Sequence, residues 1–158
     1  MKTKGFTLIE LLIVIAIIGI VAAIAVPNLL TALHKSKVKA TMGDMKNIAT
    51  AIEAYITDNS MSPGGGGVPL IADLDPLLTP FYIKVLPHED AWGEPLHYES
   101  GDVTGPNPTA YSIISYGRDG LSTPFIIADS GYVITRMEDF NNDICYSNGA
   151  FTYASKIK

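Results

Sequence analysis

The sequence of 158 residues has little with which to cross-link its chain or bind nucleic acid. It contains one cysteine, Cys145, so no intrachain disulfide can form, and we expect this residue to be buried. Beyond residue 60, twelve acidic residues outnumber five basic ones, which gives this part a net charge of −7. A surface of this sign repels phosphate backbones, so we exclude nucleic-acid binding by the C-terminal part.

Catalytic motifs are also missing. There is no Gly-x-Ser-x-Gly nucleophile motif, no phosphate-binding loop and no paired metal-binding motif. The three histidines, His34, His88 and His97, are too scattered for a catalytic triad or a transition-metal site. We therefore predict that the protein is not an enzyme, and a membrane-anchored periplasmic enzyme is the weakest of the alternatives.

Charge is absent from residues 11–33, a run long enough to cross a bilayer, which needs about 20 apolar residues. One interpretation is a secretory signal peptide, for which Ala23-Ile24-Ala25 would be the cleavage site. Another is a plain transmembrane anchor. Neither needs Glu10 at the entrance of the run, where burying a charge costs about 2.5–3.5 kcal/mol. Such an acid either has a partner or reaches the membrane surface beside Lys4.

The motif that surrounds Glu10, residues 4–10 (KGFTLIE), offers a reason for this acid. The order of a small residue, an aromatic, Thr, two aliphatics and Glu, followed by an apolar helix, resembles the processing motif of type IV pilins and type II secretion pseudopilins. The resemblance implies that residues 1–5 are a leader, that a prepilin peptidase cuts between Gly5 and Phe6, and that the Phe6 amine is then methylated. It also implies that Glu10 pairs with the Phe6 amine of a neighbouring subunit, where opposite charges offset each other's desolvation and set the register.

The orientation of the anchor depends mainly on this resemblance. Lys2 and Lys4 favour a cytoplasmic N-terminus, but three lysines just beyond the apolar run nearly cancel that bias. The family implies one pass through the bacterial inner membrane, with a cytoplasmic N-terminus and a periplasmic C-terminus. After assembly the protein would form a periplasmic filament.

Apolar residues recur every three or four positions over residues 29–56, which predicts a helix. Together with the apolar run they predict one helix over residues 6–57, with about 10–33 transmembrane and the rest packed on a head. Pro27 lies inside this helix and should kink or loosen it, because proline cannot donate the backbone hydrogen bond.

Residues 58–158 are expected to form a globular periplasmic head, so the predicted fold class is α+β: a long N-terminal helix and a small antiparallel sheet with extended loops. Asn148-Gly149 between two apolar runs predicts a hairpin with a type I′ turn. Trp92 is expected to anchor the core, and His88-Glu89-Asp90 to form a surface turn. The other predicted elements are a short helix at 72–78, strands at 96–99 and 111–115, and a further strand at 125–128 or 132–135.

Two more segments narrow the resemblance to the major pseudopilin of type II secretion systems. Residues 90–98, DAWGEPLHY, resemble its D-x-W-G-x-P-x-x-Y segment, and residues 111–120 resemble the strand and turn that follow. A type IV pilin for adhesion, twitching motility or DNA uptake is the alternative, but most pilins close a C-terminal disulfide, which one cysteine cannot do. The implied partners are other copies of the chain, minor pseudopilins, an inner-membrane assembly platform and an ATPase.

A calcium site is expected in the C-terminal loops. Asp119, Asp139, Asn142 and Asp143 gather oxygen ligands near turns, and calcium takes six to eight oxygens. The resemblance implies a calcium ion between these two segments. Here residues 121–140 form a longer stretch than in many major pseudopilins, and Asn142 supplies a neutral oxygen where an Asp often stands. The alternative is that these residues only form Asx turns in solvent.

Overall fold

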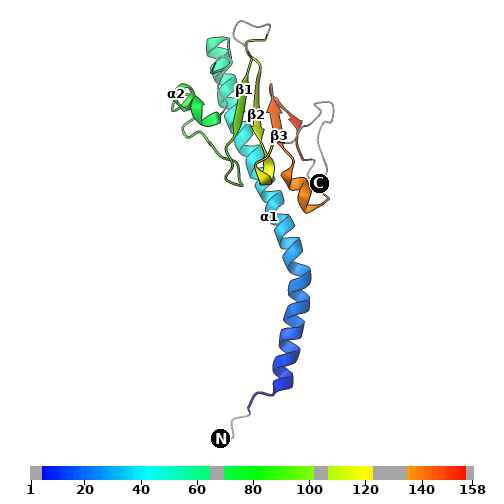
Figure 1. Cartoon of the computed structure of the whole chain (residues 1–158). Coiled ribbons are helices and arrows are strands. Elements are labelled where there is room, and N and C mark those ends of the chain that lie inside the picture. Colours follow the sequence, from blue (N-terminus) through cyan, green and yellow to red (C-terminus); the bar gives the residue numbers. More distant parts are fainter. Residues whose placement is uncertain (1–4, 65–69, 102–106, 123–134, 156–158) are drawn as a thin grey trace. The chain divides into compact units, whose positions relative to one another are not determined.

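The computed structural model describes residues 5–64, 70–101, 107–122 and 135–155 (Figure 1). The chain divides into two compact units, Met1–Lys35 and Ser36–Lys158. The boundary lies inside helix α1, which comprises Leu8–Asn59. The single long helix predicted over residues 6–57 is confirmed, although it begins and ends two residues later than predicted, and it continues through Pro27.

In the first unit the helix has no core to pack on. Every residue from Gly5 to Leu30 is exposed, although most of them are aliphatic. In the second unit one face of α1 is buried, because apolar residues return there every three or four positions. The fully buried side chains on this face are Val38, Met45, Ile48 and Ile52.

The head contains a four-stranded antiparallel sheet with the order β1-β2-β3-β4. The strands comprise His97–Ser100, Tyr111–Ser115, Ile144–Ser147 and Ala150–Tyr153. The last three match the prediction, and β1 begins one residue later than expected. The turn between β3 and β4 has positive φ angles at Asn148 (47°) and Gly149 (90°), as a type I′ turn requires.

The segment before the sheet differs from its prediction. Instead of one helix at 72–78, a 3-10 helix η1 at Ile71–Leu74 precedes a one-turn helix α2 at Asp75–Leu78. Pro76 explains the break, because its nitrogen cannot donate to the turn before it. The proposed strand at 125–128 lies outside the described residues, as does 132–135 except for Thr135.

The core joins α1 to the sheet and to η1 and α2. Along β2 burial alternates, so that Tyr111, Ile113 and Ser115 face inward. Trp92 is half-buried and packs against this core, as expected. The Tyr111 hydroxyl donates to a carboxylate oxygen of Glu53 in α1 at 2.8 Å. The pKa of Tyr111 is raised, mainly because the hydroxyl is buried and secondly because it donates to the Glu53 carboxylate. The fully buried side chains of the core outside α1 include Ile71, Leu74, Leu78, Leu96, Tyr98, Ile113, Phe140 and Ile144.

Asp90 corrects the prediction of a surface turn at residues 88–90, because only 6% of it is exposed. Its Oδ1 atom accepts hydrogen bonds from the backbone of Trp92 (2.8 Å) and Glu94 (3.1 Å). Its Oδ2 atom accepts the Ser115 hydroxyl of β2 at 2.6 Å. The Asp-x-Trp-Gly motif is thus a buried clamp between the turn and the sheet.

We expect Asp90→Ala to destabilise the head by roughly 2–4 kcal/mol, because two partly buried backbone donors and the buried Ser115 hydroxyl lose their acceptor. Glu89→Ala is the matched control: that neighbouring side chain is exposed and should change stability by less than about 0.5 kcal/mol. The midpoint of urea unfolding, followed by fluorescence of the single tryptophan, Trp92, measures both. Equal midpoints for the two variants would contradict the clamp.

Candidate functional site

The N-terminal site is built on the first turn of α1. Thr7 precedes the helix, and its backbone nitrogen and hydroxyl donate to Oε2 of Glu10 at 2.8 and 2.6 Å. In return the Glu10 nitrogen donates to the Thr7 hydroxyl at 3.3 Å. This Thr-x-x-Glu arrangement is closely related to a capping box, which satisfies backbone donors that a helix start leaves open.

This intrachain contact was not predicted, although the spacing Thr-x-x-Glu is its signal. The contact holds the Glu10 carboxylate at the backbone nitrogen of Thr7, the residue that follows Phe6. Phe6, Thr7 and Glu10 are all exposed, so the carboxylate remains accessible to a second molecule. The site can therefore hold the helix start and present a negative charge at the same time.

The helix that follows is apolar enough to cross a membrane. Its most apolar window of 18 residues has a mean hydropathy of 3.1, and no residue of that window is buried within the chain. Such a surface is stable only in lipid or against other apolar helices.

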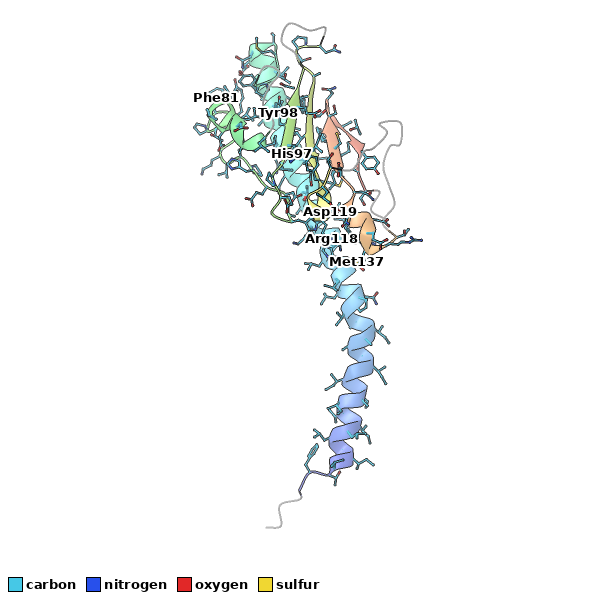
Figure 2. All side chains as sticks on the ribbon, viewed as in Figure 1. Phe81, His97, Tyr98, Arg118, Asp119 and Met137 are labelled. Atoms are coloured by element: carbon cyan, nitrogen blue, oxygen red, sulfur yellow. The ribbon has the colours of Figure 1, made fainter. Side chains whose placement is uncertain are left out.

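The C-terminal candidate site lies where two 3-10 helices meet, η2 at Gly117–Asp119 and η3 at Met137–Asn141. Figure 2 labels Arg118, Asp119 and Met137 in this region. Arg118 Nε donates to Asn141 Oδ1 at 2.9 Å. Gly117 has a φ of +70°, and a Cβ atom there would lie 2.7 Å from the carbonyl oxygen of Asn142, so a larger residue does not fit. The predicted proximity of the two segments is thus present.

The four candidate ligands have different environments. Asp119 is exposed, and its Oδ1 atom accepts the backbone nitrogen of Leu121 at 3.1 Å, as in an Asx turn. Asn142 is half-buried, and its amide donates to the Asp139 carbonyl at 3.1 Å. Only 1% of Asp143 is exposed.

Asp139 has a structural task at the start of η3. Its Oδ2 atom accepts the backbone nitrogens of Thr135 (2.6 Å) and Arg136 (2.7 Å) and the Thr135 hydroxyl (3.0 Å). These hydrogen bonds, led by the one from the Thr135 backbone, lower the pKa of Asp139. Any cation would have to bind its other carboxylate oxygen.

In the described part of the chain, no three side chains of His, Cys, Asp or Glu group closely enough to hold a metal ion. A calcium site would therefore need backbone carbonyl or amide oxygens beside its carboxylates, which calcium accepts.

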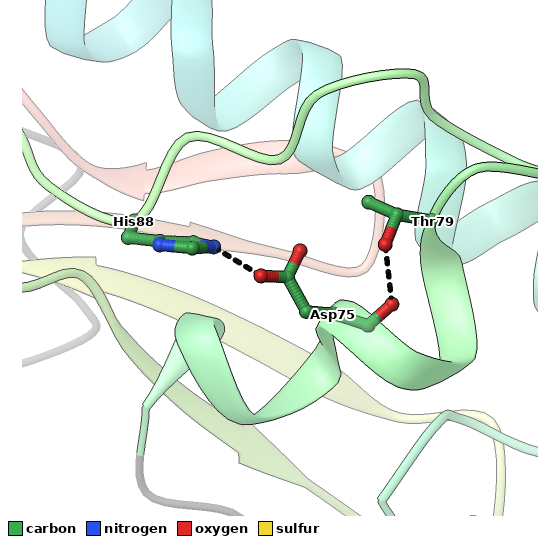
Figure 3. Close-up of polar contacts among 3 residues, drawn as sticks. All are labelled: Asp75, Thr79 and His88. Atoms are coloured by element: carbon green, nitrogen blue, oxygen red, sulfur yellow. Dashed lines mark hydrogen bonds and ion pairs between the residues drawn. The ribbon is translucent and has the colours of Figure 1, made fainter.

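The histidines and the cysteine have structural contacts of their own. His88 Nε2 lies 2.8 Å from Asp75 Oδ2, and the Thr79 hydroxyl donates to the Asp75 carbonyl at 2.7 Å (Figure 3). His97 stacks on Tyr116 with ring centroids 4.0 Å apart. Cys145 is buried as expected, and burial raises the pKa of its thiol, which makes it unreactive.

Comparison with known proteins matches both parts of the chain. Residues 1–26 match the model of the prokaryotic N-terminal methylation motif, and residues 28–124 match that of type II secretion system (T2SS) protein G. No solved structure matches the chain.

Curated relatives agree with these models. Type II secretion system core protein G of Pseudomonas aeruginosa is 34% identical over 132 residues, which cover 75% of this chain and 86% of the relative. The protein of the same name from Escherichia coli is 34% identical over 130 residues, covering 75% and 84%. Type IV major fimbrial protein FimA of Dichelobacter nodosus is 51% identical, but over 55 residues that cover 35% of each chain. The chain therefore belongs to the type II secretion system protein G family.

Proposed function

We propose that this protein is the structural subunit of a type II secretion pseudopilus and that it assembles through its apolar N-terminal helix. The observation that carries this function is the exposed aliphatic surface of α1 in a chain of the protein G family. Fully burying each large aliphatic side chain yields about 1.5–3 kcal/mol, so this surface favours a bilayer before assembly and neighbouring helices afterwards.

The protein would be stored in the bacterial inner membrane with its N-terminus in the cytoplasm and its head in the periplasm. A prepilin peptidase would process it, and an inner-membrane platform with an ATPase would add it to a filament of identical chains beside minor pseudopilins. The role is structural, without catalysis. A type IV pilin is the second candidate, favoured by the fimbrial relatives, but their similarity covers about half as much of the chain as that of the protein G relatives.

Assembly in this proposal depends on Glu10. The Thr7 contact holds its carboxylate at the start of the helix, where the Phe6 amine of a second subunit can approach it. An ion pair between the two would allow both charges to leave water together. A carboxylate without that amine would resist entry into the apolar filament core.

Leader processing gives the first test. Protein purified from native membranes should begin at Phe6 and carry one additional methyl group on its amine. Intact mass and N-terminal sequencing measure both. Cleavage after Ala25, or a chain that retains Met1, would contradict the processing site.

Substitutions of Glu10 separate its two contacts. Glu10→Leu should insert into the membrane at least as well as the wild type, because a charge penalty is removed, yet yield few or no filaments. Glu10→Gln is the matched control, since its amide oxygen can still accept from Thr7 but carries no charge. Filament yield in a reconstituted assembly assay should fall for both variants, and a wild-type yield from Glu10→Gln would refute the ion pair.

We also propose that calcium binds where η2 and η3 meet. Asp119, Asn142 and Asp143 would hold the ion together with backbone carbonyl oxygens, and Asp139 would approach it through Oδ1 when the ion binds. Support comes from the contact between the two segments and from the burial of the Asp143 side chain. The ion would tie the two ends of the stretch 121–140 together and stabilise the head.

The calcium proposal predicts a thermal shift. At calcium 100-fold above its dissociation constant the fold would gain about 2.7 kcal/mol, and a chelator would remove this gain. Asp119→Ala and Asp143→Ala should each abolish the shift, and Asn142→Asp should strengthen it. His88→Ala removes a side chain that contacts Asp75 elsewhere in the head and should leave the shift intact. Titration calorimetry at millimolar calcium without heat or stabilisation would reject the site.

A further inference from the structure

Phe81, in the described part of the head, is a strongly exposed aromatic side chain that the proposed function does not yet use. Phe81 is 82% exposed and Val85 is 73% exposed, although Tyr82 and Ile83 between them pack on the core. We call residues 79–85 the Phe81 loop. Figure 2 shows the Phe81 side chain at the periphery of the head. Its ring meets that of Tyr82 edge-on, with centroids 4.9 Å apart, so the loop presents it in a defined position.

A groove of about 360 Å³ lies elsewhere on the head. We call it the α1–β4 groove; its lining is Lys39, Met42, Gly43, Lys46, Phe151 and Ser155. Met42 and Phe151 provide an apolar surface, and the Lys46 amine lies 5.7 Å from the centre of the Phe151 ring. Ser155 is 6% exposed, and its hydroxyl makes no hydrogen bond in the described part of the chain.

The loop and the groove have complementary charge. Asp58, whose carboxylate accepts the Tyr82 hydroxyl, and Asp75, whose carbonyl accepts the Thr79 hydroxyl, lie beside the loop. With Lys84 inside the loop and His88 counted as neutral, their net charge is −1. The groove has two lysines and no acid in its lining, a charge of +2. Specific interfaces usually have an apolar centre on both surfaces, and the charged residues around it have opposite signs on the two partners.

Topology places the loop and the groove at opposite edges of the sheet. The segment that contains the loop follows Leu70, which bridges to His97 of edge strand β1. The groove includes Phe151 of β4, the other edge strand. Two different complementary surfaces on one chain make head-to-tail contacts, which do not close into a two-fold dimer but continue into rings or helices.

We infer that the Phe81 loop of one subunit docks into the α1–β4 groove of a second copy, with Phe81 against Met42 and Phe151 and the lysines facing its acidic flank. The inference rests on the proposed homopolymer and adds a contact between heads to the contact between N-terminal helices. The Ser155 hydroxyl would gain a partner in the docked loop.

Cross-linking in assembled filaments tests this contact. Gly43 has no atom within 4 Å of a Cβ placed on it, so Gly43→Cys should be tolerated, and Cys145 is buried and should not compete. The full-length double variant Gly43→Cys, Phe81→Cys, treated with a short bismaleimide, should give a ladder of covalent multimers. Either single variant should stay monomeric, and so should the control pair Gly43→Cys, Leu121→Cys, since Leu121 is an exposed apolar residue outside both surfaces.

Filaments that are visible by electron microscopy but give no ladder overturn the docking and leave the filament function standing. No filaments from the wild type would instead refute the proposed function. If the Phe81 substitution prevents assembly, Val85→Cys replaces it, and absence of a ladder counts in the same way. Phe81→Ser should lower filament yield by about tenfold without lowering the amount of membrane monomer, whereas Leu121→Ser should do neither. Equal yields for both would also overturn the docking.

Discussion

The apolar surface of α1 is the constraint on which the rest of the protein depends. Residues 11–33 carry no charge and contact no core of their own, so the molecule needs either lipid or other copies around this helix. A helix that moves between those two surroundings cannot be specified by apolar contacts alone, because lipid tails and aliphatic side chains are nearly equivalent. In the proposed assembly, Glu10 at the entrance of the helix would supply this distinction, since its charge is costly in lipid and favourable beside an amine.

The head meets a different requirement. The second half of α1 has a buried apolar face on which the sheet packs. The same helix is therefore the apolar segment of the first unit and part of the core of the second. The Asp90 clamp and the Tyr111–Glu53 hydrogen bond then tie turn, sheet and helix into one core. In the proposed filament, a rigid head of this kind would carry separate docking surfaces at its two edges, and the apolar helices would supply most of the binding energy.

Elements with a local signal could be predicted from the sequence. The long helix follows from apolar spacing, and the β3–β4 hairpin from Asn148-Gly149, whose positive φ angles few other pairs adopt. The start of β1 could not be predicted, because the Leu96 nitrogen and carbonyl bond to His88 and Ile71 before the ladder begins. Nor could the burial of Asp90, which depends on Ser115, 25 positions along the chain. Of the candidate sites, the Glu10 motif could be predicted from the sequence, but its hydrogen bonds to Thr7 were not. The ligands near Asp143 could not be assigned in the same way, because they depend on contacts between turns that are distant in the sequence.

In the proposed filament, the Glu10 carboxylate meets the Phe6 amine of a neighbouring subunit inside an apolar core. A helical reconstruction of native filaments by cryo-electron microscopy, at a resolution that separates side chains, measures this contact directly. We expect a carboxylate oxygen within about 2.7–2.9 Å of a neighbour's Phe6 nitrogen, with the Thr7 contact retained within each chain. Filaments in which Glu10 contacts only its own Thr7, and the neighbour's amine lies elsewhere, would contradict it.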